Sequence, residues 1–197
     1  MKKILTILTV AGFIATSINA QKSVTSGLEY GVKAGVNFCT FKESGGGYSA
    51  STSGTGFLGG GYVAIPVSDA IKIQPELLYD NQSSTASGNT TNLNYLSVPV
   101  LVKYAIQSSG FSVSAGPQIG LLLSAKEKVD GNSLDIKDGF NGTNFSLTLG
   151  VEYALPIGIN FSARYVSGLS NIYKNAPDGY TDKLSNFLIA VGYKLSK

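Results

Sequence analysis

The chain of 197 residues suits one domain of ordinary size; 43% of its residues are hydrophobic and only 14% are charged, against roughly 25% charged residues in an average soluble domain. It has no histidine and a single cysteine, Cys39, which excludes a Ser-His-Asp mechanism, a His-ligated metal site and an intrachain disulfide. Two of the 15 basic residues lie in a predicted export signal, and the others nearly balance the 12 acidic residues, so no nucleic-acid partner is expected.

Residues 1–20 have the features of an export signal. Lys2 and Lys3 precede an apolar run over residues 4–15, and Ala20 supplies the small residue that a signal peptidase requires. The run is shorter than the roughly 20 residues of a spanning helix. We therefore predict a signal peptide at 1–20 and one mature domain at 21–197. The mature part has no apolar run long enough for a spanning helix, so it could cross a bilayer only as a closed β-barrel.

The mature part repeats one pattern, in which apolar residues alternate with small or polar residues. In residues 145–155, for example, Leu147 and Leu149 alternate with Ser146 and Thr148. This period of two sends the two sets to opposite faces of a β-strand. We therefore predict an all-β fold, an eight-stranded antiparallel up-and-down transmembrane β-barrel. The eight runs lie at residues 30–38, 55–67, 70–81, 92–106, 110–124, 145–155, 157–165 and 186–195.

The connections between the runs alternate between short and long along the chain. Tight turns are predicted at residues 68–69, 107–109 and 155–158. Long loops rich in Gly, Ser, Asn and Asp are predicted at residues 42–54, 82–91, 125–143 and 171–183. Outer-membrane barrels have short periplasmic turns and long external loops, so we expect both termini and all the tight turns on the periplasmic side of an outer membrane.

The non-apolar face of the runs has too few charges for a surface in water, which would carry roughly 25–35% charged residues. Small residues with a few long charged ones suit the interior of an eight-stranded barrel, which side chains fill. We expect Glu76 and Glu152 to pair across this lumen with some of the five cations. The predicted lumen charge cluster consists of Lys33, Lys72, Glu76, Lys103, Glu152, Arg164 and Lys194.

Aromatic residues of the apolar face fall near the two ends of the runs, as the two interfaces of a bilayer favour. The predicted membrane-interface residues near the tight turns are Tyr30, Tyr104, Tyr153 and Tyr193. Those near the long loops are Phe57, Tyr79, Phe145 and Phe187.

Three prolines lie within predicted strands, at Pro75, Pro99 and Pro117. Proline removes a hydrogen bond from a β-ladder. We therefore expect bulges or strand breaks at these positions.

Several motifs resemble one known family. They are QPELLY at residues 74–79, LNYLSVPVLVKY at 93–104, AGPQIGLLLSA at 115–125, GVKAGVNF at 31–38 and VGYKL at 191–195. Together they resemble the PorT-like outer-membrane β-barrel family of Bacteroidetes over nearly the whole mature chain. The resemblance implies an eight-stranded outer-membrane barrel that tolerates prolines in its strands and is inserted by the barrel-assembly machinery.

The function that we expect is that of a non-enzymatic, monomeric barrel without a cofactor or a metal, embedded in outer-membrane lipid. The sequence has no histidine, and no pair of carboxylates stands out at the strand ends, so nothing in it supports catalysis. Eight strands also enclose too little space for an open pore. The long loops would contact a protein or surface ligand, or the barrel would reinforce the envelope. Two alternatives remain open: an accessory role in protein secretion, which the namesake of the resembled family suggests, and a soluble periplasmic lipocalin-like binding barrel.

Overall fold

The computed structural model describes residues 27–86, 88–106, 109–129, 131–174 and 179–196, so the predicted signal peptide lies outside the described residues. In this part of the chain the strands are long and follow one another closely. They are β1 (Glu29–Gly45), β2 (Tyr48–Pro66), β3 (Ile71–Ala86), β4 (Asn89–Ala105), β5 (Phe111–Val129), β6 (Asn132–Asp135), β7 (Thr143–Ala154), β8 (Ile159–Gly168) and β9 (Thr181–Lys194), with a 3₁₀ turn, η1 (Lys137–Gly139), between β6 and β7.

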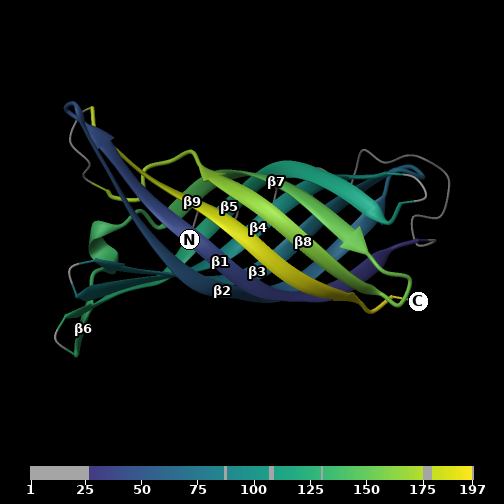
Figure 1. The fold of residues 1–197 in the computed structure, drawn as a ribbon, viewed down its shortest axis with the longest axis horizontal. Helices are drawn as coiled ribbons and strands as arrows, with labels where there is room; N and C mark the ends of the chain where they lie inside the picture. The colour runs from purple at the N-terminus through teal and green to yellow at the C-terminus, as the bar shows by residue number, and fades with distance from the viewer. Residues whose placement is uncertain (1–26, 87, 107–108, 130, 175–178, 197) are drawn as a thin grey trace, which may run out of the picture.

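Eight of these strands close into a ring. Each pairs antiparallel with its neighbour in the chain, and β1 pairs with β9, from Gly31 opposite Lys194 to Ser44 opposite Thr181. The short β6 pairs with the end of β5 and lies outside the ring. Figure 1 shows the strands tilted around a common axis. The predicted eight-stranded, antiparallel, up-and-down barrel is therefore confirmed.

The predicted tight turns all lie at one end of the barrel, which also holds the start of β1 and the end of β9; we call it the turn end (Figure 1). Val67 N–H donates to the carbonyl of Ile71 at 2.8 Å, and Leu155 N–H donates to Ile159 at 2.8 Å. Ile106 N–H donates to the carbonyl of Phe111, also at 2.8 Å. Hairpin-type hydrogen bonds therefore flank each of the three turns. Residues 107–108, in one of these turns, lie outside the described residues.

Two of the predicted long loops are wrong, because the strands continue through them, and the predicted loop at residues 125–143 is wrong in part, because it contains the paired end of β5 and β6. β1 and β2 stay paired as far as Gly45 opposite Tyr48, and Gly46 and Gly47 make the turn with φ angles of +58° and +81°. Positive φ at both central residues is the geometry of a type I′ hairpin turn, which glycine adopts at little cost. Likewise β3 and β4 extend to Ala86 and Asn89. Apart from Tyr48, these extensions consist of polar residues, glycine and alanine, so they lack the apolar alternation by which a strand is recognised.

The expected bulges or breaks at the prolines are also wrong. β3, β4 and β5 run through Pro75, Pro99 and Pro117 without a shift of register there, and the irregularity between β4 and β5 lies instead at Asn94 and Tyr95. Each proline pairs with the following strand of the ring, while the ladder to the preceding strand is interrupted beside it. A strand inside a ring has two neighbours, so the missing N–H costs a bond on one side only.

The barrel has its apolar residues outside and its polar residues inside. Leu149 and Val151 are 51% and 53% exposed, whereas Thr148 and Arg164 are 0% and 5% exposed. A soluble barrel or sandwich would have the opposite arrangement, with apolar side chains in the core. Among the residues that the structure describes, no helix has the length and apolar character that crossing a membrane requires.

Candidate functional site

The centre of the lumen holds an ionic cluster built around Glu76 of β3. The Lys33 ammonium lies 2.9 Å from Glu76 Oε1, and the Arg164 guanidinium donates to both carboxylate oxygens, at 2.7 and 2.8 Å. Gln74 Nε2 donates to the same carboxylate at 2.6 Å. All four residues are buried. A carboxylate held by a bidentate arginine and a lysine is a rigid, directional arrangement, and it ties three strands together across the lumen.

The strands of the cluster lie on opposite sides of the ring. β8, which carries Arg164, is separated from β3 by three strands in either direction, so the arginine spans the lumen. Its neighbour on β7 is Gly150, where a Cβ atom would lie 2.8 Å from Arg164 Cγ. The absence of a side chain at Gly150 therefore leaves room for the aliphatic part of the Arg164 side chain. Lys33 lies 5.5 Å from the ring centroid of Tyr62, a cation–π distance.

The turn end of the lumen opens into a charged cavity of about 560 Å³. Lys103 and Glu152 form an ion pair on its wall, with 2.5 Å between Nζ and Oε1. Glu29 lies at its rim, 2.7 Å from the Lys72 ammonium and 3.9 Å from that of Lys194. The structure thus brings the seven predicted charges to the lumen in three separate groups.

Two carboxylates of the lumen are absent from the predicted set, although the alternation could have identified both. Glu29 has the same parity as Lys33 but precedes the first predicted run. Asp80 has the same parity as Glu76 on β3 and is buried; Asn37 Nδ2 and Gln82 Nε2 donate to it at 2.5 and 2.7 Å. Amide groups rather than cations therefore hold the Asp80 carboxylate among the described residues.

The other end of the lumen, which we call the hairpin end, is covered by a cap of apolar side chains. Phe140 and Ile172, from the connections on either side of β7 and β8, are buried against inward residues of four strands. Their segments are joined: Asn141 N–H donates to the Ile172 carbonyl at 2.7 Å, and the Phe140 and Tyr173 rings lie 4.7 Å apart. Burial raises the pKa of the Tyr173 hydroxyl. The strand residues of the cap are Cys39, Leu93, Tyr95, Leu122, Ala125 and Leu184.

No pattern in the sequence predicts this cap. A long polar connection is ordinarily a surface loop, and no alternation marks where it folds back. The available signal was the presence of three large apolar or aromatic residues, Phe140, Ile172 and Tyr173, within connections otherwise rich in polar residues and glycine.

The eight predicted interface aromatics all lie on the outer face of the barrel and are exposed there. Tyr30, Tyr104, Tyr153 and Tyr193 are near the turn end, and Phe57, Tyr79, Phe145 and Phe187 are nearer the hairpin end. Phe57 and Tyr79 lie side by side, with ring centroids 6.0 Å apart. Other outward aromatics were not in the predicted set, namely Phe38, Phe111, Phe161 and Tyr165.

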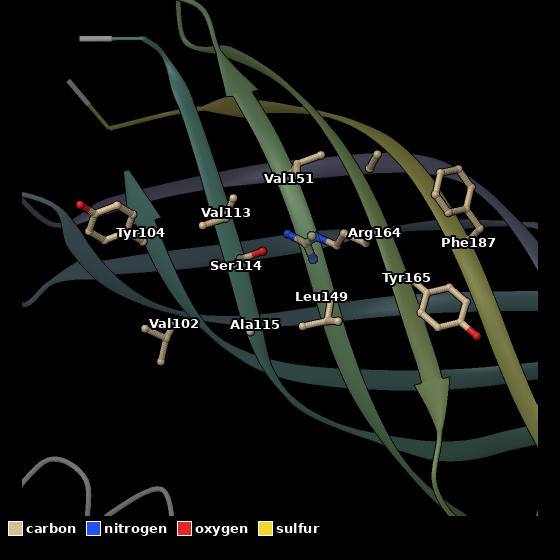
Figure 2. A pocket seen from close by; sticks show the side chains of 12 residues that line it. Val102, Tyr104, Val113, Ser114, Ala115, Leu149, Val151, Arg164, Tyr165 and Phe187 are labelled. Carbon is tan, nitrogen blue, oxygen red and sulfur yellow. The ribbon is translucent and has the colours of Figure 1, made fainter. Parts of the chain in front are cut away.

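Between these aromatics the outer face has an apolar hollow of about 610 Å³ (Figure 2). Val102, Val113, Leu149 and Val151 line it, and the small side chain of Ala115 deepens it. Tyr104, Tyr165 and Phe187 stand around it. A concave apolar surface of this kind fits hydrocarbon rather than water.

Comparisons with known proteins place this architecture among outer-membrane barrels. The family described as "outer membrane protein beta-barrel domain" matches residues 19–174. Among solved structures, the attachment invasion locus protein Ail of Yersinia pestis is similar, with 16% sequence identity, a TM-score of 0.52, and coverage of 85% of this chain and 99% of Ail. Neisserial surface protein A is also similar, with 15% identity, a TM-score of 0.52, and coverage of 86% and 99%. The comparison with curated proteins finds no match.

Proposed function

Because the chain belongs to the outer membrane protein beta-barrel domain family, we propose that it is a non-enzymatic barrel, closed to diffusion, that presents its hairpin end to the outside of the cell as a contact surface. The turn end then faces the periplasm. The observation that carries the proposal is the asymmetry of the two ends, together with a lumen filled by its own side chains.

The filled lumen supports a structural rather than a transporting barrel. Lys33, Glu76 and Arg164 bridge the ring at its centre, and Phe140 and Ile172 cover its hairpin end. A solute that entered the cavity at the turn end would have to displace buried ion pairs to go further, at a cost of several kcal/mol. Eight strands also leave too narrow a space for an aqueous channel.

The hairpins supply the contact surface. The β1–β2 hairpin and the β5–β6 hairpin extend beyond the ring at the same end (Figure 1). Tyr48 and Leu134, on these two hairpins, are 66% and 54% exposed. Exposed aromatic and aliphatic residues on paired strands can contact a partner with little loss of conformational entropy. The proposed partner is a protein or a surface ligand, and the barrel itself is proposed to act as a monomer after insertion by the barrel-assembly machinery.

The alternatives differ in their support. Membership of an outer-membrane family argues against a soluble lipocalin-like binder. The exposed apolar residues on the outer face of the barrel also argue against it, because such a binder would carry apolar residues inside. A secretion-accessory role, and the narrower PorT-like assignment from which it comes, rest on the sequence motifs alone.

Cysteine labelling on whole cells tests the orientation of the barrel. Ser133 on β6 and Asp69 in a tight turn are both exposed, whereas the native Cys39 is buried. A membrane-impermeant maleimide should label Ser133→Cys on intact cells, and should label Asp69→Cys only after the outer membrane is permeabilised. The wild type gives the background. Labelling of Asp69→Cys alone on intact cells would place the hairpins in the periplasm and refute the proposed contact surface.

A further inference from the structure

The outer face of β1 and β9 carries a ladder of matched residue pairs near the hairpin end. Phe38 lies opposite Phe187, Thr40 opposite Ser185, and Lys42 opposite Lys183. All six have the outward parity, because the alternating Cys39, Leu184 and Asn186 are buried in the lumen. From the middle of the barrel toward the hairpins, the ladder therefore passes from aromatic to hydroxyl to ammonium groups.

The pairing of the two lysines is unfavourable within the protein alone. Like charges directly opposite each other on antiparallel strands are destabilising. Both lysines are exposed, and within the described part of the chain neither has a carboxylate in ion-pair contact. The adjacent acidic residues, Glu43 and Asp182, alternate with them and so point to the other face of the sheet. An anion outside the protein would relieve this repulsion.

The height of the lysines on the barrel indicates where such an anion would lie. Four residues of strand separate Lys42 from Phe38, which is about 13 Å along the strand at roughly 3.3 Å per residue. With a tilt of about 40° the lysines lie about 10 Å above the aromatic pair. Aromatic residues mark the boundary of the hydrocarbon core, and a lysine side chain can bend toward the headgroup layer just above it.

We propose that Lys42 and Lys183 together bind the phosphate of an outer-leaflet lipid whose acyl chains lie along Phe38 and Phe187. Thr40 and Ser185, between the two pairs, are placed to hydrogen-bond the lipid's ester or sugar oxygens. The proposal rests on the proposed function, since it requires the hairpin end to lie at the outer leaflet.

Titration with lipid A tests the site independently of orientation. The folded protein in neutral detergent is titrated with lipid A, and the bound fraction is measured by native mass spectrometry. Since each lysine near an anionic membrane surface contributes about 1 kcal/mol, the double variant Lys42→Gln/Lys183→Gln should bind lipid A about 30-fold more weakly than the wild type. Heat-dependent gel mobility verifies that each variant is folded.

A matched control removes two other lysines. Lys126 and Lys128 are also exposed, but they are neighbours along β5 instead of a pair across two strands. Lys126→Gln/Lys128→Gln should bind lipid A as the wild type does. Equal losses in the two double variants, or no loss in either, would overturn the proposal. Inorganic phosphate can be added to the complex with lipid A as a competitor. If phosphate displaced lipid A at concentrations similar to that of lipid A, the result would also overturn the proposal, in favour of a site for soluble phosphate. A further outcome is that the double variant loses lipid A binding as expected while whole-cell labelling places the hairpin end in the periplasm. That result would refute the proposed function, but not the affinity of Lys42 and Lys183 for lipid A.

Discussion

Glu76→Gln should lower the free energy of unfolding by about 3–5 kcal/mol, the cost of leaving buried charges without their partner. Glu76 is 3% exposed and is the carboxylate partner of both Lys33 and Arg164. With a neutral amide in its place, two cations remain close together in the lumen. The measurement is urea unfolding of the protein reconstituted in lipid vesicles, followed by the heat-dependent gel shift.

Glu29→Gln is the matched control for this prediction. Glu29 also contacts two cations, Lys72 and Lys194, but its side chain is 28% exposed at the rim of the turn-end cavity. Exposed ion pairs contribute about 0–1 kcal/mol, so this variant should unfold nearly as the wild type does. Equal destabilisation by the two substitutions would mean that the central cluster has no special role in holding the ring together.

Leu149→Arg should destabilise the barrel in a bilayer by about 2–4 kcal/mol, the measured range for arginine at the midplane on the lipid face of a barrel. Leu149 lies on β7 midway between the interface aromatics Phe145 and Tyr153. The same urea titration in vesicles measures the effect. The physical cause is the transfer of a guanidinium from water into hydrocarbon.

Leu134→Arg distinguishes lipid from water as the surroundings of Leu149. Leu134 on β6 is 54% exposed and Leu149 is 51% exposed, so the two leucines are equivalent in accessibility to the protein's surroundings. Leu134 lies on the hairpin outside the ring, where an arginine meets water and should change stability by about 0–0.5 kcal/mol. If both substitutions had this small effect, the outer face of β7 would be in water.

The ring of eight strands could be predicted because alternation depends only on the side-chain direction of a strand. Where one face is apolar, as at Leu147 and Leu149, every second residue identifies the face. Alternation does not mark the hairpin extensions, such as residues 48–54, because Ser, Thr and Gly are acceptable on either face in water. There the hydrogen bonds of the paired backbones make the strands, and the sequence pattern does not report them.

The sequence predicts which side chains point into the lumen, but it does not predict which of them contact each other. That Glu76 and Arg164 point inward follows from alternation; that they meet depends on ring closure, which places β3 opposite β8. Asp80 has the same parity as Glu76, so its inward direction follows from alternation as well. The apolar residues Phe140 and Ile172 can be seen in the sequence, but the cap itself arises from contacts between two connections far apart in the sequence, which no local pattern reports.

Spin-label accessibility at Leu147, Leu149 and Val151 measures most directly whether the outer face of the barrel lies in lipid. Each position is changed to cysteine and labelled in protein reconstituted in vesicles, while the buried native Cys39 stays unlabelled. Collisions with oxygen, which concentrates in hydrocarbon, should dominate at all three positions over collisions with a water-soluble nickel chelate. Dominance of the chelate at these positions would contradict a membrane-embedded barrel.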